Sequence, residues 1–399
     1  MAYNIADIAT AFFLSNTIKT ANLIQIDNPN FYIMYNKITN IFLTAFLMSI
    51  AATSCTESTP NYLSIGEPEY ITELPLIKNI ELIDTVDYEV YGMKSIKVVD
   101  SLLIIGTNSS WTAISTRDQK LLANFFSIGQ GPGEFNSIPR TGEGCFFSKN
   151  DSLYVLAQDH NNGRILELNL SKAVANEPFE VKPAFNSPEI NNNCWTTIPC
   201  GEGKVFLSRA NNNFTGFNRY VVEQDTIYSL PITQQIDQIT IESDGDINLL
   251  SKVARFSPQT GKIVEFMIYL NQINVFSIDG NWGKTICVGK KLDNLSKIER
   301  QPRFFKTNTY ITGSVWPQGF GGLYSGYSEI DVQKLLSEHN TIQFFDWEGN
   351  GICEVKIPYQ ALAFDLDFDN KVLYVINQED DMLLRYDASD VVDMYKNRL

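Results

Sequence analysis

The sequence predicts an all-β protein, because short runs of β-branched and aromatic residues recur along the chain and end at Asp, Asn or Gly. The runs repeat as a strand–turn–strand unit about every 45–55 residues, a spacing typical of propeller blades. Six such units fit into residues 63–399. We therefore predict that this part of the chain is one six-bladed β-propeller of four-stranded antiparallel blades.

The predicted strands follow in order along the chain. In each unit a strand ends near Asp, Asn or Gly, a second strand ends in a polar turn, and a third leads out. The runs lie at 100–108, 111–129, 151–159, 163–171, 203–211, 219–232, 264–289, 308–316, 321–330, 340–358 and 371–387. A single blade cannot bury both of its faces, so blades stack around an axis. A pair of packed sheets, a β-sandwich, is the alternative.

The ends of the ring need their own elements. We expect an N-terminal strand from the segment Tyr62–Val90 to close the ring as an outer strand of the last blade. Two short helices are predicted, at Asp331–Glu338 and at Ser389–Asn397, the second with Ser389 as its N-cap.

The N-terminal region is typical of an export signal rather than of a folded domain. Lys37 precedes an apolar run at Ile41–Ile50, and small residues then lead to Cys55. The run is shorter than the roughly 20 apolar residues that cross a bilayer. Its length fits a signal peptide. We predict a lipoprotein signal at residues 34–54 and a lipidated Cys55; an ordinary cleaved signal is the alternative.

The boundaries around this signal follow from its start. Met34 is the natural first residue, so residues 1–33 are a non-native extension or, alternatively, a genuine leader. Residues 55–62 then form a linker to the propeller. Several acyl chains on one cysteine anchor a protein stably, which predicts contact with membrane lipid through Cys55.

Charge and histidine content argue against several functions. The net charge of −15 and the isoelectric point near 4.7 argue against nucleic acid as a partner. His160 and His339 are the only histidines, which weighs against a histidine-based metal site and a Ser-His-Asp triad. With no catalytic constellation visible, we predict a protein that is not an enzyme and has no cofactor, calcium being the one possible ion.

Cysteine and aspartate leave two questions open. Cys194 and Cys200 are close in sequence, and Pro199 between them could bring them together as a disulfide or hold them apart. Asp-rich stretches at 242–248 and 365–370 suggest calcium binding as a hypothesis, but neither has the residue spacing of a calcium-binding loop. We interpret the alternating Asp365, Asp367 and Asp369 as a solvated strand end.

Three short motifs carry a resemblance to a known family. They are GQGPGEF at Gly129–Phe135, GLYSGY at Gly322–Tyr327 and FDWEGN at Phe345–Asn350. From Ile65 to Asp387 the chain resembles the six-bladed, TolB-like β-propeller lipoproteins of gut anaerobes, the group labelled BF3164-like. The resemblance implies a propeller fold and an envelope address, and no established activity.

Two of these motifs have structural interpretations. GQGPGEF lacks the Lys and the following helix of a phosphate loop. We interpret it as a crossover between blades, with Phe135 in the core and Glu134 bonding backbone N–H groups or Arg140. FDWEGN is typical of a hairpin turn whose amides bond Asp346.

A cluster of aromatic and glycine residues at 316–327 predicts a ligand site at the mouth of the central channel. It contains Trp316, Tyr324 and Tyr327, and Trp195 and Arg255 are candidates from neighbouring blades. Aromatic rings with polar tips suit a sugar or a peptide. The alternative is that the aromatic rings fill the core between blades.

These observations predict a lipid-anchored protein of the cell envelope, facing the periplasm and more consistent with the outer membrane than the inner. We predict a monomeric, non-catalytic scaffold that binds a small ligand, a glycan or a protein partner. The alternative is a calcium-dependent, lactonase-like hydrolase with a cation in the channel, since such enzymes also use six blades. Fold alone does not decide between the two.

Overall fold

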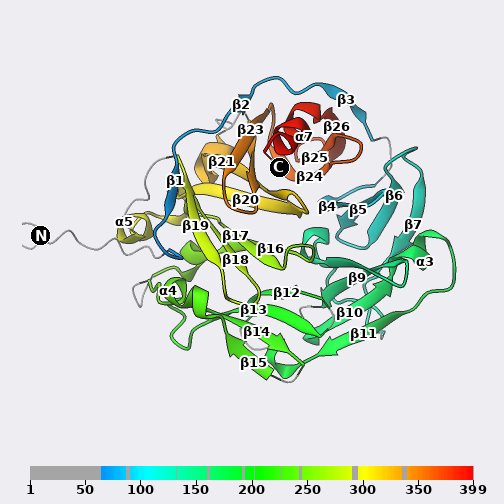
Figure 1. The fold of residues 1–399 in the computed structure, drawn as a ribbon, viewed down its shortest axis with the longest axis horizontal. Coiled ribbons are helices and arrows are strands. Elements are labelled where there is room, and N and C mark those ends of the chain that lie inside the picture. The colour runs from blue at the N-terminus through cyan, green and yellow to red at the C-terminus, as the bar shows by residue number, and fades with distance from the viewer. Residues whose placement is uncertain are drawn as a thin grey trace, which may run out of the picture. The chain divides into compact units, whose positions relative to one another are not determined.

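The computed structural model describes residues 64–86, 90–131, 133–159, 162–190, 194–201, 203–224, 226–241, 245–289, 295–334 and 339–398. The predicted extension, signal, lipidation site and linker, residues 1–62, lie outside the described residues. The propeller lies within the unit Pro60–Leu399. Its six sheets surround one axis and confirm the predicted six-bladed, all-β fold (Figure 1).

The first three blades are each continuous in sequence and pair neighbouring strands antiparallel. From the axis outward, their strands are β4 (Met93–Val99), β5 (Leu102–Thr107), β6 (Trp111–Ser115) and β7 (Leu121–Phe125); β8 (Cys145–Lys149), β9 (Ser152–Asp159), β10 (Arg164–Asn169) and β11 (Val181–Asn186); and β12 (Cys194–Pro199), β13 (Lys204–Ala210), β14 (Phe217–Glu223) and β15 (Thr226–Ser229).

The last three blades combine C-terminal strands with strands from the N-terminal end of the described chain. Their C-terminal strands are β16 (Lys252–Ser257), β17 (Lys262–Met267), β18 (Gln272–Ser277) and β19 (Gly283–Val288); β20 (Thr307–Trp316), β21 (Gly319–Ser328), β22 (Asn340–Asp346) and β23 (Gly351–Ile357); and β24 (Ala361–Asp367), β25 (Val372–Asn377) and β26 (Met382–Asp387).

Residues 64–86 form a segment that we call the strap, which runs along the outside of these three blades (Figure 1). β3 (Leu82–Thr85) pairs antiparallel with β26 as the fourth strand of the sixth blade, so the predicted ring closure is confirmed. β1 (Glu69–Ile71) and β2 (Leu76–Ile77) pair parallel with β19 and β23. The fourth and fifth blades therefore have a fifth strand, which we did not predict.

Apolar side chains of the strap are buried near the junctions between blades, which we call seams. Ile65 lies in the core shared by the third and fourth blades, and its N–H donates to Thr285 Oγ1 at 2.8 Å. Leu74 packs between the fourth and fifth blades, and Val86 between the sixth and first. All three are buried. The strap is thus held by side-chain packing as well as by strand pairing.

The GQGPGEF crossover has the predicted structural role. Phe135 is fully buried in the core of the first two blades, with its ring 4.8 Å from that of Phe126. The Glu134 carboxylate accepts the N–H of Gly131 at 2.7 Å. The Arg164 guanidinium donates to the Glu134 carbonyl at 2.7 Å, so an arginine does reach this loop, although it is not Arg140.

Aspartates at the hairpin turns bond the amides that follow them. The Asp346 carboxylate accepts the N–H groups of Glu348 and Asn350, which confirms the interpretation of FDWEGN. Asp367 does the same for the next turn, at 369–370. Our interpretation of 365–369 as a solvated strand end is wrong for Asp365 and Asp367, because both are buried and hydrogen-bonded.

Helices are short and lie between or after the blades. They are α3 (Leu170–Val174), α4 (Gln234–Asp237), α5 (Leu295–Glu299), α6 (Glu329–Gln333) and α7 (Ser389–Lys396), with 3₁₀ turns η1 (Thr141–Glu143), η3 (Pro188–Ile190), η4 (Pro231–Thr233), η5 (Ile247–Leu250) and η6 (Arg303–Phe305). The helix predicted at Ser389–Asn397 forms as α7, whereas the helix predicted at Asp331–Glu338 begins two residues earlier and ends at Gln333. Residues 335–338 lie outside the described part. Ser389 is not the N-cap of α7: it is the first helical residue, and its N–H donates to the Asp387 carboxylate at 2.9 Å.

The extended strand β12 separates Cys194 from Cys200 and excludes a disulfide between them. Cys194 begins this strand and Cys200 follows its end, which places them roughly 20 Å apart at about 3.3 Å per residue. A disulfide needs Cα atoms within about 7 Å. Both cysteines are free thiols.

Two buried ion pairs cross seams. At the seam between the third and fourth blades, Arg219 of β14 donates to both oxygens of Glu265 on β17, with Nε–Oε1 at 2.9 Å and Nη2–Oε2 at 2.7 Å. Its Nη1 donates to Asp237 at 2.6 Å. At the seam between the sixth and first blades, Lys97 of β4 pairs with Asp365 of β24 at 3.1 Å.

In the ion pair of Arg219, burial and nearby charges have opposite effects on the pKa values of the carboxylates. Burial alone would raise the pKa of Glu265, but Arg219 and Lys252 lower it below the ordinary value. For Asp237 burial outweighs its bonds to Arg219, so its pKa is raised. The difference follows from geometry, because Glu265 accepts two guanidinium nitrogens and lies near a second cation.

Candidate functional site

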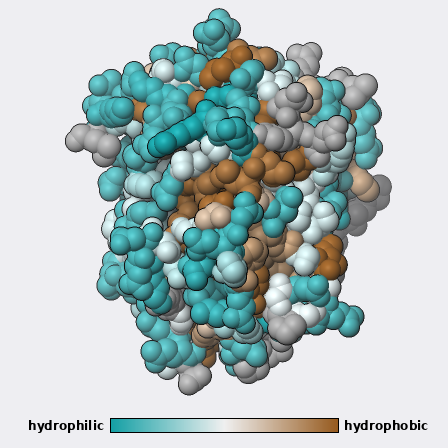
Figure 2. All heavy atoms as spheres, turned by 90° about the vertical axis from the view of Figure 1, so that its right-hand side faces the viewer, coloured by the Kyte–Doolittle hydropathy of each residue, from teal (hydrophilic) through white to brown (hydrophobic). Residues whose placement is uncertain are grey.

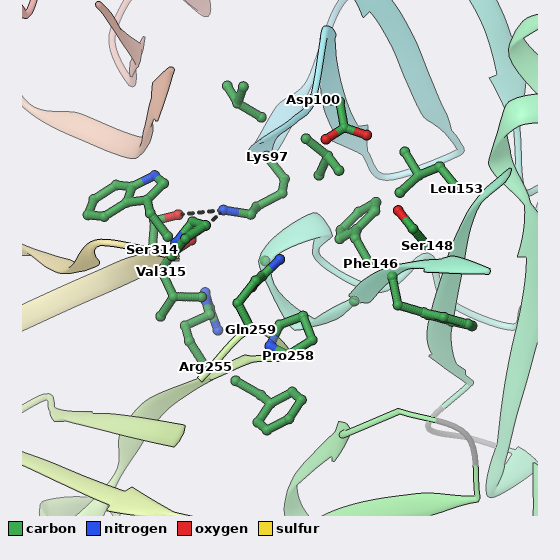
Figure 3. A pocket seen from close by; sticks show the side chains of 18 residues that line it. Lys97, Asp100, Phe146, Ser148, Leu153, Arg255, Pro258, Gln259, Ser314 and Val315 are labelled. Carbon is green, nitrogen blue, oxygen red and sulfur yellow. Dashed lines mark hydrogen bonds between the residues drawn. The ribbon is translucent and has the colours of Figure 1, made fainter. Parts of the chain in front are cut away.

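A pocket of about 190 Å³ lies where the inner strands of several blades end; we call it the axial pocket (Figure 3). Strands β4, β8, β16 and β20 of four different blades contribute to it. Its lining consists of residues 97–100, 142, 144, 146–148, 153, 255, 256, 258, 259 and 314–317. Because four blades build it, its shape depends on the closed ring rather than on one loop.

One wall of the pocket carries Lys97. Its ammonium donates to the Val315 carbonyl at 2.8 Å and to Ser314 Oγ at 3.4 Å, and it pairs with Asp365 (Figure 3). Asp365 in turn accepts the indole N–H of Trp316 at 2.8 Å. These bonds join β4, β20 and β24 and fix the position of the ammonium.

Arg255 of β16 lies on the same wall and is buried. Its Nε donates to the Gly313 carbonyl at 2.9 Å, Nη1 to its neighbour's carbonyl at residue 254 at 2.8 Å, and Nη2 to Thr312 Oγ1 at 3.2 Å. Burial lowers the pKa of Arg255 to about 10, against the opposing effect of Glu143. Among the ion pairs of the described residues, none includes Arg255.

The opposite wall is largely apolar. Figure 3 shows Phe146 and Leu153 across the pocket from Lys97 and Arg255. Phe147, Phe256 and Pro258 add further apolar surface. The exposed Gln259 stands between the two walls, and the exposed Asp100 lies at the rim. The pocket thus offers a cationic wall facing an aromatic one.

The turn η1 supports the cationic wall. The N–H of Thr141 donates to Ser95 Oγ on β4 at 3.0 Å, which fixes the turn against the first blade. A Cβ atom at Gly142 would lie 2.8 Å from Nε of Arg255, in severe conflict with its guanidinium. Glycine at this position therefore lets the turn approach the arginine.

The structure brings together two of the five residues predicted from sequence. Arg255 and Trp316 both line the axial pocket, although the Trp316 ring is buried and stacks on Phe344 at 5.8 Å. Tyr324 and Tyr327 lie further along β21, roughly 20 Å or more from the turn at Trp316.

The remaining predicted side chains point to other neighbours. Tyr324 packs edge-on against Tyr310, and Tyr327 lies edge-on to His339. Trp195, 44% exposed, contacts Phe217 in the third blade. The rings of Trp316 and Tyr324 pack in the core between blades, as the alternative interpretation of the cluster stated.

Sequence reasoning missed Lys97, Phe146 and Gln259. Lys97 lies in the run MKSIKVV, where an alternating lysine usually faces solvent. The one available signal was a second charged run, DLDFDN, which supplies its partner Asp365. No pattern in the sequence shows that these two strands are neighbours.

The described residues contain neither a metal-binding cluster nor a membrane-spanning helix. No group of three or more His, Cys, Asp or Glu side chains there is arranged to hold a metal ion. None of the helices in the described part of the chain has the length and apolar character to cross a membrane.

The fold and pocket define a class: a six-bladed β-propeller with a pocket at the ends of its inner strands. Comparison with known protein families and with characterised proteins finds no match. Similar solved structures include a member of the DUF4221 family from Bacteroides vulgatus, with 11% identity and a TM-score of 0.46, covering 77% of this chain and 94% of that one.

Two further structures are similar at the same level. A Bacteroides fragilis protein described as exported has 11% identity and a TM-score of 0.45, covering 79% of this chain and 99% of that one. Regucalcin, a calcium-binding protein from Agrobacterium tumefaciens, has 9% identity and a TM-score of 0.42, covering 79% and 95%. Identities of this size concern the fold alone.

Proposed function

We propose that this chain is a lipid-anchored envelope β-propeller of the BF3164-like kind, and that it acts as a non-catalytic scaffold that binds a small ligand in the axial pocket. The observation that carries the proposal is the pocket itself, built by four blades with one cationic and one aromatic wall. Ligand sites are typically concave and apolar with a few fixed polar groups.

The polar groups of the pocket are held in a way that suits binding. The Lys97 ammonium already bonds Asp365 and a carbonyl, and the Asp365 carboxylate is fully buried. A general acid or base must reach the proton that it transfers. Lys97 and Asp365 are instead positioned by each other, which favours recognition over proton transfer.

The envelope address rests on the signal that ends at Cys55. Lipidation there would place the propeller at a membrane, facing the periplasm, with the outer membrane as the proposed home. Metabolic labelling with an alkyne fatty acid should label the protein in cells, and Cys55→Ser should abolish the label. Labelling that survives this substitution would remove lipidation at Cys55 from the proposal.

A ligand screen by thermal shift tests the binding function. The mature protein in detergent micelles is heated with calcium, glycans, peptides and bile acids. A ligand present at 100 times its Kd stabilises the native state by about 2.7 kcal/mol, a readily measured shift. The substitution Gln259→Trp should fill the pocket and remove the shift, whereas Gln378→Trp, in the exposed β25–β26 turn, should not.

The outcomes separate the possible partners. A ligand whose shift persists in Gln259→Trp binds elsewhere, and the axial pocket is then not its site. Absence of any shift across the screen would contradict small-ligand binding and favour a protein partner, which cross-linking in cells would identify.

The alternative function, a calcium-dependent hydrolase, would place a cation in the channel. Asp365 is the inner-strand carboxylate bonded to the pocket wall, and a cation there would have to displace the Lys97 ammonium from it. A calcium-dependent rise in Tm, reversed by a chelator, would favour this alternative.

A further inference from the structure

The side chains of the two walls indicate a class of ligand. This inference rests on the proposed function, in which the axial pocket is the binding site. We infer that the ligand is a small carboxylate with an apolar body, its carboxylate on the wall of Arg255 and its body against Phe146. Three observations support this assignment in turn: a buried guanidinium bonded only to neutral acceptors, the positive charge of the wall around it, and an apolar surface opposite.

The first step is the charge of Arg255. A guanidinium taken out of water is costly unless an anion pairs with it. Here its bonded acceptors are two carbonyls and one hydroxyl, all neutral. A guanidinium has five N–H donors, so these three bonds leave two available. A ligand carboxylate would supply the missing negative charge and accept those donors.

The second step is the charge that surrounds this wall. Lys97 adds a positive charge that Asp365 balances, and the Gln259 amide adds neutral donors at the entrance. Asp100 is the acidic side chain among the lining residues, and it is exposed at the rim, where water screens its charge. Outside the lining, Glu143 and Arg140 act on Arg255 with opposite signs. The inner part of the wall is therefore net positive, which favours an anion.

The third step is the opposite wall. Phe146 is buried, and Phe147 and Leu153 extend the apolar surface beside it. A bare inorganic anion would leave this surface against water, whereas an aliphatic or aromatic body would cover it. A volume of about 190 Å³ lies below the usual range for drug-sized ligands. The ligand is accordingly small.

Matched acids and amides test this assignment. Isothermal titration calorimetry on the mature protein would compare phenylacetate with phenylacetamide and hexanoate with hexanamide, and would include acetate and phosphate as anions without an apolar body. We expect each acid to bind at least about ten-fold more tightly than its amide, because one charged hydrogen-bonded contact is worth that much. Acetate and phosphate should bind more weakly than either acid.

Two substitutions at exposed lining positions leave the core intact. Gln259→Glu adds a negative charge at the entrance and should weaken acid binding several-fold without changing amide binding. Asp100→Asn removes a negative charge and should tighten acid binding; its backbone φ of 51° is one that Asn adopts well. Gln378→Glu adds the same charge as Gln259→Glu at a turn outside the pocket lining and should change neither.

The results separate this inference from the proposed function. Acids and amides that bind equally, both lost in Gln259→Trp, would leave the pocket as a binding site and overturn the carboxylate. Phosphate binding as tight as that of the acids would overturn the apolar body. No binding of any probe would overturn the carboxylate class, and only the wider thermal-shift screen would then decide whether the pocket binds anything.

Discussion

The propeller has a half that is covered by the strap and a half that is not. In the fourth to sixth blades the outermost strands are β1, β2 and β3, which come from the strap. In the first three blades the outer strands β7, β11 and β15 have no further partner within the described chain. One segment therefore adds an outer strand to three blades and not only to the blade that closes the ring.

Both halves expose some large apolar side chains. Figure 2 faces the side of the molecule where β7 and α3 lie, and it shows a band of apolar atoms there. Leu121 of β7 is 51% exposed. In the covered half the strap buries Leu74 and Val86 near the seams, whereas its Leu82 is 50% exposed. A buried ion pair stands at each of the two seams where the halves meet.

The largest expected effect comes from breaking the ion pair at one of these seams. Arg219→Met removes the partner of the fully buried Glu265, which leaves an uncompensated charge between the third and fourth blades. We expect a loss of about 3–5 kcal/mol in the free energy of unfolding. Urea unfolding followed by circular dichroism measures it.

A matched variant sharpens this test. Arg303 pairs with Glu329 in an exposed position, so Arg303→Met should change stability little. If Arg219→Met were as mild as Arg303→Met, the two halves would not depend on the buried pair.

The next effect concerns the strap. Leu74→Ala removes a buried side chain between the fourth and fifth blades, and we expect a loss of about 2–4 kcal/mol. Leu76→Ala in the same strap removes a side chain that is 44% exposed, and should cost less than about 1 kcal/mol. Thermal unfolding of both variants gives the comparison. Equal losses would mean that strand pairing alone holds the strap.

A smaller effect depends on pH and again tests the seam between the third and fourth blades. Lys252 donates to Ser208 at 2.8 Å and lies over the ring of Phe217, near Arg219, Asp237 and Glu265. Burial lowers its pKa to about 8, whereas an unfolded lysine titrates near 10.4. Between these values the unfolded chain binds more protons, so stability attributable to Lys252 rises with pH.

The measurement is a difference between two proteins. The unfolding free energy of the wild type minus that of Lys252→Met should rise on the order of 1–3 kcal/mol from pH 8 to pH 10. A flat difference would show that Lys252 keeps its ordinary pKa in the fold.

The smallest effect is expected in the open half. Leu121→Lys changes an exposed side chain on the outer strand β7, so the free energy of unfolding should change by no more than about 0.5 kcal/mol. Urea unfolding measures it beside Leu74→Ala. A loss above 1 kcal/mol would contradict the distinction between a covered and an open half.

The sequence predicted the fold from periodicity and turn residues, and it predicted that a strand from Tyr62–Val90 closes the ring, which β3 does. It did not predict β1 and β2, because they have three and two residues and show no alternation. Their pairing depends on the free edges of β19 and β23, which exist only in the assembled ring. Ser389 was misplaced because a neighbouring aspartate bonds the helix start instead.

The site was less predictable than the fold. Arg255 was named only as a candidate from a neighbouring blade, and Lys97 resembled an ordinary solvent-facing residue. The cluster at 316–327 was judged by closeness in sequence, and an extended hairpin separates such residues along its length. Asp365 was judged solvated because its partners, Lys97 and Trp316, are distant in sequence.

The strap also sets the order in which the molecule can be completed. Asp84 of β3 pairs with Arg385 of β26 across 301 residues. At about 5–20 residues per second, the ribosome adds these residues in roughly 15–60 s. β3, one of the first strands made, is thus among the last to find its partner. During that interval β3 has no partner strand, and protection of its unpaired backbone groups during biogenesis becomes part of making the protein.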